Sequence, residues 1–307
     1  MENFKTADIF KLVIPHWKKL LTVALISLGL GYGITFLLKP LYKSYAIVYP
    51  VNLSPSSEES NTEQLLQWFN SEEVKKNVAK KFDLYKHYNI ELDDPKHETY
   101  FNLKYKELVS ISATLYESIE ITVKDQEPEM AQKIVQGIID ETNALISSVR
   151  KERLKEYIEN NEKEYIKEAL KLDSLQKIVL GIRIENNIVD FGAQAKALAK
   201  KMTKGQLNDS ENKTWNALKT KETEISRQST ILASQMGTYN YFRNEVNKFN
   251  YEYNSYISYT NVVSKPTLPD AKCYPIRSLI AVIISISTVL LAFIYIVVTN
   301  YKNQKVD

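Results

Sequence analysis

Two long apolar runs without a charged residue lie near the ends of the chain and flank a polar middle. The first extends from Leu20 to Leu38 and the second from Ser278 to Val298. At about 1.5 Å of rise per residue, a helix over either run can cross a hydrocarbon core of roughly 30 Å. Backbone polar groups in that core must be satisfied within the segment, which favours helices. The pattern predicts two transmembrane helices, with both termini on one side of a membrane.

Basic residues indicate which side of the membrane the termini occupy. Lys18 and Lys19 precede the first run, and Lys302 and Lys305 follow the second. The positive-inside rule therefore places both ends in the cytoplasm, although some basic residues also lie at the opposite end of each run. The predicted segments are a cytoplasmic N-terminus (1–19), a span (20–38), a periplasmic domain (39–277), a second span (278–298) and a cytoplasmic tail (299–307).

A cleaved signal peptide is the alternative interpretation of the first run. The run is longer than the apolar region of a typical signal peptide. It leads into Lys39 and Pro40 rather than into a small-residue cleavage site. We therefore favour an uncleaved membrane anchor, which leaves the bulk of the chain on the side of the membrane away from the termini.

The segment after the first run shows strand and helix patterns in turn. Alternating and aromatic residues from Tyr42 to Pro50 predict a strand that the proline ends. Apolar spacing then predicts a helix from about Thr62. Ser71, followed by two glutamates, is a candidate N-cap for another helix. The apolar positions expected on its buried face are Val74, Val78, Phe82 and Tyr85.

A second strand, Ser118 to Lys124, leads into a very long helical pattern. The pattern begins at Pro128 and continues beyond Val179, which corresponds to on the order of 80 Å of helix. A less regular stretch between Gly181 and Gly192 is a candidate break.

Polar residues from Gly205 to Glu211 predict a turn, and a returning helix from about Lys213 to Tyr256 is expected to pack against the first. Thr260 to Val263 predicts a third strand. The fold class is therefore α+β. Two transmembrane helices flank an α/β base, and a long helical hairpin over about residues 128–256 protrudes from it.

Charge and cysteine content exclude several functional classes. The formal net charge is only +3, and no basic stripe interleaved with aromatic residues is present, so we expect no nucleic-acid partner. Cys273 is the single cysteine, which rules out a disulfide within the chain. A domain exported without disulfides must be held together by packing or by oligomerisation.

The sequence lacks the motifs that would indicate catalysis. It contains no phosphate-binding GxxxxGK[ST], no HExxH, no GxSxG and no paired histidine and cysteine cluster. The three histidines are scattered without ligand spacing. We therefore predict a protein that is not an enzyme, with no catalytic residue, no metal and no cofactor.

Three prolines between the third strand and the second span form the first candidate functional feature. Proline restricts its own φ and disfavours helix in the residue before it. Pro266, Pro269 and Pro275 should therefore hold this connector extended until the span begins. A spacer without a direct partner is the alternative interpretation.

Glycines in the first span and aromatic residues in the returning helix are two further candidates. Gly29 and Gly33 form a GxxxG pair, a spacing that allows close helix packing, although glycine is also simply tolerated in membrane helices. The aromatic run from Tyr239 to Tyr259 could stack on sugar rings, but such stripes more often pack against neighbouring helices.

Taken together, these features resemble the polysaccharide co-polymerases, the Wzz-type chain length determinants. The likeness includes the proline-rich segment from Val262 to Arg277 and the strand entering the long helix at Ile119 to Val123. It also includes the Ser71 helix start, and Tyr42, Ser44 and Pro50 after the first span. Each motif is weak alone, but their order and spacing over essentially the whole chain are specific.

The resemblance implies an oligomeric inner-membrane protein that regulates the chain length of a surface polysaccharide such as O-antigen. The implied partners are further copies of the chain and a glycan polymerase in the same membrane, with lipid-linked polysaccharide as a further candidate. The alternatives are an envelope scaffold or export adaptor, and a membrane activator of a separate cytoplasmic tyrosine kinase. Neighbouring genes would separate these three functions.

Overall fold

A computed structural model describes residues 6–53 and 58–303 of the chain, which divide into two compact units. Within the described residues, the first unit comprises the chain up to Ile146 and from Ser258 onward, and we call it the base unit. The second unit, Ser147–Ile257, is called the hairpin unit. The predicted cytoplasmic ends fall partly outside the described residues, because residues 1–5 and 304–307 are not among them.

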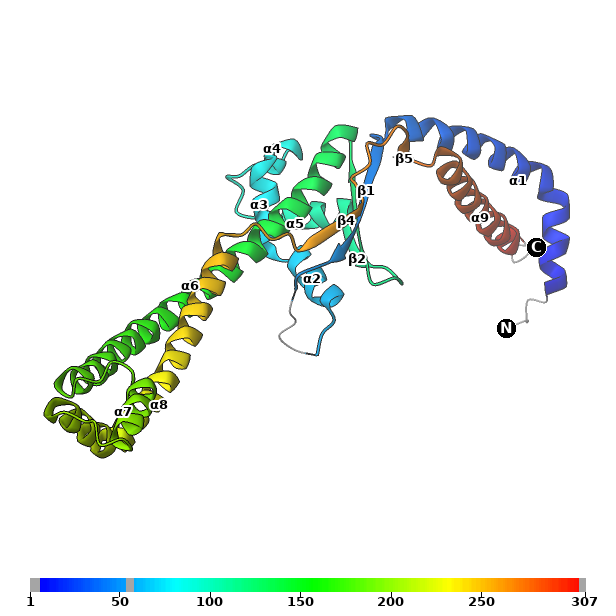
Figure 1. The fold of residues 1–307 in the computed structure, drawn as a ribbon. Coiled ribbons are helices and arrows are strands. Elements are labelled where there is room, and N and C mark those ends of the chain that lie inside the picture. Colours follow the sequence, from blue (N-terminus) through cyan, green and yellow to red (C-terminus); the bar gives the residue numbers. More distant parts are fainter. Residues whose placement is uncertain (1–5, 54–57, 304–307) are drawn as a thin grey trace. The chain divides into compact units, whose positions relative to one another are not determined.

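The base unit contains both apolar helices and all of the described strands (Figure 1). In chain order its elements are α1 (Thr6–Ile34), η1 (Thr35–Leu37), β1 (Leu41–Pro50), α2 (Asn61–Phe69), α3 (Glu72–Lys81), α4 (Leu84–His87), α5 (His97–Leu108), β2 (Val109–Ala113), β3 (Ile119–Asp125), the first turns of α6 (Pro128–Glu185), β4 (Thr260–Ser264), β5 (Lys272–Tyr274) and α9 (Arg277–Asn303).

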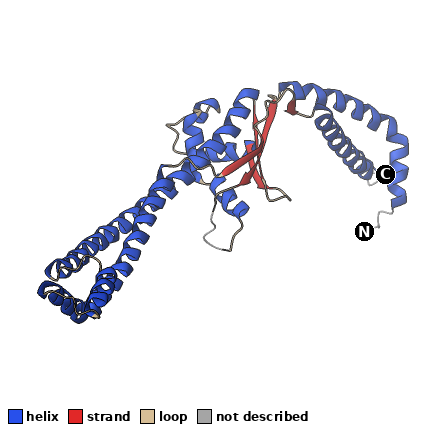
Figure 2. Ribbon diagram, in the orientation of Figure 1, coloured by secondary structure: helices blue, strands red, loops and turns tan. Residues whose placement is uncertain are grey.

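The strands form one five-stranded antiparallel sheet in the order β2-β3-β1-β4, with β5 also pairing with β1 (Figure 2). The central strand β1 follows the first apolar helix directly, and its neighbours come from distant parts of the sequence. It pairs with β3 from Tyr42–Asp125 to Val48–Ile119, and with β4 through Pro50 and Thr260. The strand that follows the first span thus organises the whole sheet.

The core of the base unit lies between one face of this sheet and the helices. Alternate residues of β1 and β3 are fully buried, among them Val48 and Ile121. The first turns of α6 add Ile134 and Ile138 to this core. Gly137 on the same helix allows a close approach, because a Cβ there would lie 2.3 Å from the Phe82 ring.

Asn143 joins α6 to the start of β4. Its amide donates to the Thr260 hydroxyl at 2.7 Å, and its carbonyl oxygen accepts from the Tyr259 N–H at 2.7 Å. The long helix and the third predicted strand are therefore held together by one amide side chain.

The two apolar helices pack against each other in antiparallel orientation. Gly31 on α1 faces Ala281 and Ile284 on α9, and the Ser27 hydroxyl lies 3.3 Å from that of Ser285. Antiparallel packing leaves the N- and C-terminal ends of the pair on one side, as the sequence predicted.

The apolar windows of these helices are Pro15–Leu37 and Arg277–Thr299, so both extend slightly beyond the predicted spans. Only 17% of the first window and 11% of the second is buried inside the protein. The core helix of a soluble domain would be mostly buried. Exposed apolar helices of this length are instead suited to lipid.

The hairpin unit consists of the remainder of α6, α7 (Phe191–Met202) and α8 (Asp209–Asn254). Helix α8 packs against α6 along its length, as predicted. Tyr157 stacks on Phe249 with 5.6 Å between ring centroids, and Arg150 pairs with Glu252 at 3.3 Å. On α6 the residues Leu154, Ile158, Leu172 and Val179 are buried, whereas Val149 is exposed.

Helix α7 closes the end of the hairpin unit around a small apolar cluster. Its buried residues come from the turn after α6, from α7 and from α8, and they are Ile188, Leu198, Leu218 and Ile225. Gly205, with φ of +64°, allows the chain to turn between α7 and α8. The sequence analysis placed this turn correctly but did not identify α7.

One further expectation needs correction. The face expected to run from Val74 to Tyr85 is not one helix, because α3 ends at Lys81 and Asp83 adopts the left-handed conformation with φ of 48°. The candidate break between Gly181 and Gly192 is confirmed, because α6 ends at Glu185 and α7 begins at Phe191.

Candidate functional site at the membrane-side joint

The connector between β4 and α9, residues 265–276, runs alongside β1, and together we call these two segments the membrane-side joint. Both segments adjoin a span, because β1 follows α1 and the connector precedes α9. The six sequence-predicted residues other than the glycines all lie in this joint. Of these, Tyr42 lies opposite Lys272 of the connector and Ser44 contacts Thr267, whereas Pro50 ends β1 opposite Thr260 of β4.

Ser44 and Thr267 form the centre of the joint. The buried Ser44 hydroxyl donates to the Thr267 carbonyl oxygen at 2.7 Å. The Thr267 N–H donates to the Tyr45 carbonyl oxygen at 3.2 Å, and the Thr267 hydroxyl accepts from the Tyr45 N–H at 3.2 Å. These three hydrogen bonds hold the middle of the connector on the central strand.

A short strand attaches the connector to β1 a second time. β5 pairs with the beginning of β1, with Tyr42 opposite Lys272 and Leu41 opposite Tyr274. Tyr42 is also opposite Asp125 on β3, so this position carries neighbours on both sides. The sequence analysis predicted an extended connector, but it did not predict that the connector contributes a strand to the sheet.

The three prolines of the connector differ in their surroundings. The Pro266 carbonyl oxygen accepts from the Gln132 amide at 2.9 Å, which ties the connector to α6. Pro269 is half-buried, and Pro275 is buried where the chain enters α9, after a cis peptide bond with Tyr274. The connector is thus held on β1 and α6 by contacts within the chain, and its role in setting oligomer geometry stays a prediction.

A cation–π contact links the two spans beside the joint. The Arg277 guanidinium lies 3.9 Å from the centroid of the Phe36 ring. Arg277 begins α9, and Phe36 lies in the short helix η1 that follows α1. Because Phe36 is 59% exposed, a contact of this kind contributes about 0.5–1 kcal/mol.

The glycines of the first span behave differently from one another. A Cβ at Gly31 would lie 3.3 Å from Ala281 and from Ile284, whereas none placed at Gly29 or Gly33 would have a neighbour within 4 Å. The close approach within the chain is therefore at Gly31. The Gly29 and Gly33 pair lies off this contact, and its proposed packing role remains a prediction about a second copy.

The buried carboxylate of Asp125 lies at the end of β3, opposite Tyr42 of the joint. It accepts from the Tyr88 hydroxyl at 3.1 Å and from the Glu127 N–H at 2.9 Å, and it lies 3.0 Å from His87 Nε2. Burial, and then the charge of Asp125, raise the pKa of the Tyr88 phenol well above its usual range. Asp125 therefore stabilises the start of α6, which follows it directly.

The sequence analysis missed several of these residues. Thr267, Gln132 and Gly31 act through contacts between segments far apart in the sequence, and no local pattern identifies them. Asp125 was within reach, because it directly follows the predicted strand and lies three residues before the proline that starts the long helix, where a carboxylate can accept from a backbone N–H.

The geometry of the joint supports mechanical coupling between the spans and the sheet. The joint contains hydrogen bonds between neutral groups, β pairing and a cation–π contact. Within residues 6–53 and 58–303, no three His, Cys, Asp or Glu side chains lie close enough to hold a metal ion. What the joint can do is transmit a change in the arrangement of the spans to the sheet and to α6.

The aromatic run of the returning helix divides into packed and exposed members. Tyr239 lies 5.3 Å from Tyr165 between ring centroids, and Phe249 stacks on α6 as described above. Tyr241, Tyr251 and Tyr256 are largely exposed. Packing therefore accounts for the inner members, and carbohydrate contact stays a prediction for the exposed three.

Comparison with known proteins adds a family match. Residues 4–92 match the family model of Wzz, described as chain length determinant protein. This segment contains the first span, β1 and the helices α2 to α4. No curated protein matches the sequence.

Solved structures with a similar course of the chain include polysaccharide co-polymerases. A full-length bacterial polysaccharide co-polymerase is 10% identical, with a TM-score of 0.45 and coverage of 98% of this chain and 99% of that chain. The wild-type Shigella flexneri lipopolysaccharide O-antigen chain-length regulator is 12% identical, with a TM-score of 0.32 and coverage of 75% and 99%. A Wzz dodecamer fitted to a cryo-EM map is 11% identical, with a TM-score of 0.34 and coverage of 75% and 98%. All three TM-scores are below 0.5.

Proposed function

We propose that the chain is a regulator of surface polysaccharide chain length, because residues 4–92 match the family model of the Wzz chain length determinant protein. It acts as an inner-membrane co-polymerase without enzymatic activity of its own. Its two spans anchor the base unit, and the sheet and the long helices lie in the periplasm. The observation that carries this proposal is the family match, which includes the first span and the central strand of the joint.

The partner of this regulator is a glycan polymerase in the same membrane. The joint supports such a role, because it connects both spans to the central strand through Ser44, Thr267 and β5. A polymerase that contacts the spans could therefore sense or impose the arrangement of the base unit. Lipid-linked polysaccharide is a further candidate partner, for which exposed Tyr241, Tyr251 and Tyr256 offer stacking surfaces.

The protein works as a homo-oligomer. The hairpin unit exposes large apolar side chains, including Ile166, Leu170 and Ile184, which are 57%, 67% and 67% exposed. Exposed apolar residues gathered on one element are typical of interaction surfaces. A second copy of the chain is the simplest partner that could cover them, and the uncontacted Gly29 and Gly33 would provide a matching surface in the membrane.

Deletion of the gene tests the function directly. Surface polysaccharide from the deletion strain, resolved by gel, should change from a clustered modal length to a broad, short-biased ladder. Re-expression of the wild-type chain should restore the cluster. An unchanged ladder, in a strain without a redundant copy, would overturn the proposal in favour of an envelope scaffold.

A further inference from the structure

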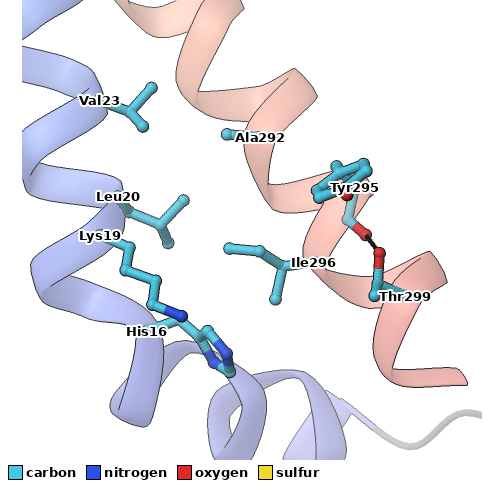
Figure 3. Close-up of a pocket in the computed structure, with 8 residues that line it drawn as sticks. All are labelled: His16, Lys19, Leu20, Val23, Ala292, Tyr295, Ile296 and Thr299. Atoms are coloured by element: carbon cyan, nitrogen blue, oxygen red, sulfur yellow. Dashed lines mark hydrogen bonds between the residues drawn. The ribbon is translucent and has the colours of Figure 1, made fainter. Parts of the chain in front are cut away.

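The paired spans leave a groove of about 310 Å³ between the ends that carry the two termini (Figure 3). Figure 3 shows both helices contributing side chains to it. The lining residues are His16, Lys19, Leu20 and Val23 from α1, and Ala292, Tyr295, Ile296 and Thr299 from α9.

The lining changes from apolar to polar along the spans. Val23 and Ala292 lie toward the middle of the pair, and Leu20 points toward Ile296 below them. Lys19 and Thr299 lie at the end nearest the termini. The groove therefore has apolar walls at the depth of the acyl chains and a cationic opening at the depth of the headgroups.

The size and the charge of the groove favour a lipid over a further protein segment. Its volume is at the lower end of the range for small-molecule sites, roughly 300–1,000 Å³, whereas another helix would need a channel about 10 Å wide. Lys19 supplies a positive charge at the opening, and basic pockets between transmembrane helices on the cytoplasmic side bind anionic headgroups.

We propose that this groove binds one anionic phospholipid from the membrane leaflet on the side of the termini. One acyl chain lies between the Leu20 and Val23 side of α1 and the Ala292 and Ile296 side of α9, and the phosphate pairs with the Lys19 ammonium. The bound lipid fills space that the two spans leave open and so stabilises their pairing. This site goes beyond the chain-length function, and the two can fail separately.

Lipid retention by the full-length chain tests the site. The purified, delipidated protein is mixed with dioleoyl phosphatidylglycerol or dioleoyl phosphatidylcholine, and native mass spectrometry counts the lipids bound per protomer. Loss of one Lys near the headgroups corresponds to about a five-fold change in binding. Lys19→Gln should therefore lower phosphatidylglycerol retention about five-fold and leave phosphatidylcholine unchanged.

Two matched variants control for general effects. Lys18→Gln removes the same charge one residue away, where the ammonium lies 6.0 Å from the Trp17 ring and does not line the groove. It should retain phosphatidylglycerol as the wild type does. Ala292→Phe fills the groove and should abolish retention, whereas Leu291→Phe, at an exposed position beside it, should not.

Three outcomes would overturn the proposal. Equal losses in Lys18→Gln and Lys19→Gln would show only general surface charge. Full retention by Ala292→Phe would show that the lipid binds elsewhere. Displacement of phosphatidylglycerol by an equal concentration of a polyprenyl phosphate would assign the groove to the glycan carrier lipid instead.

Discussion

The buried hydroxyl of Ser44 donates a hydrogen bond of 2.7 Å to the backbone carbonyl oxygen of Thr267, 223 residues later in the chain. Ser44 lies on the strand that follows the first span, and Thr267 lies on the connector that precedes the second. The contact therefore closes a loop through the whole extramembrane part of the chain. Any movement of the spans relative to the sheet must either break this hydrogen bond or move both residues together.

Replacement of Ser44 by Ala should destabilise the base unit by about 1 kcal/mol, because the half-buried Thr267 carbonyl oxygen loses its hydroxyl donor. Chemical denaturation of the full-length chain in a mild detergent measures this change. Ser110→Ala, at an exposed position of β2, is the matched control and should change stability little. Equal effects of the two substitutions would show that Ser44 has no special role.

Replacement of Pro269 and Pro275 by Ala should change polymer length while the amount of protein stays the same. The reason is that alanine removes the restriction on φ that keeps the connector from other conformations. The polysaccharide ladder and an immunoblot measure the two quantities. Pro95→Ala, in an exposed turn outside the joint, is the control. A normal ladder from the double variant would refute a role of these prolines in length control.

Replacement of Gly31 by Leu should separate the two spans, because even a Cβ there lies 3.3 Å from Ala281 and Ile284. The yield of a disulfide between Ser27→Cys and Ser285→Cys, in a Cys273→Ser background, reports the distance between the spans. In the Gly31→Leu variant this disulfide yield should fall several-fold. With Gly31 retained, the two cysteines should crosslink readily, because the serine hydroxyls that they replace lie 3.3 Å apart.

Replacement of Gly29 and Gly33 by Leu should weaken the oligomer and leave the contact between the two spans of one chain intact, unlike Gly31→Leu. A Cβ at either position contacts nothing within the chain, so the disulfide yield between the spans should stay at its reference level. Assembly into oligomers, measured by chemical crosslinking, should weaken because close packing of a second copy is blocked. An unaltered oligomer would remove the GxxxG pair from the interface.

Replacement of Asp125 by Ala should cost roughly 3 kcal/mol, since it removes a buried carboxylate and leaves the Tyr88 hydroxyl and the Glu127 N–H without their acceptor. Asp140→Ala is the matched control, because Asp140 is exposed and accepts only from Gln136 on its own helix. Denaturation curves of the two variants measure the difference in their stability. Similar midpoints for Asp125→Ala and Asp140→Ala would contradict the role of Asp125.

Stability should fall in alkaline solution because of buried tyrosines. Burial, and then the charge of Glu98, raise the pKa of Tyr85 to about 12, whereas a tyrosine in the unfolded chain titrates near 10. The folded state therefore holds this proton more tightly. The stabilisation is fully present below pH 10 and is lost as the pH rises from 10 to 12. Denaturation midpoints of Tyr85→Phe should fall less over this range than those of the wild type.

The membrane spans and the long helices followed from local patterns, because each is encoded within one continuous stretch. Uncharged apolar runs specified α1 and α9, and the spacing from Ile134 to Val179 specified α6. Strand β1 was recognisable from its alternation and from Pro50. Helix α5 and strand β2 were missed, because β2 is only five residues long and α5 begins without a side-chain cap.

The joint shows the limit of such reasoning. The three prolines marked the connector as unusual, and Tyr42, Ser44 and Pro50 were noted for their place after the first span. Nothing local pairs Ser44 with Thr267 or places Lys272 beside Tyr42, because hydrogen bonds between distant segments depend on sheet register. The choice of Gly31 over Gly29 as the contact between the spans likewise depends on the rotation of two packed helices.

By itself, the sequence determined that the chain has two spans, a strand after the first of them and a long helical pair, since periodicity and length are properties of each segment alone. Only the tertiary structure decided which residues meet across the joint, which glycine lies between the spans and where a lipid-sized groove is left. Those outcomes depend on the packing of segments far apart in the sequence, and packing is set by shape and register that no single segment contains.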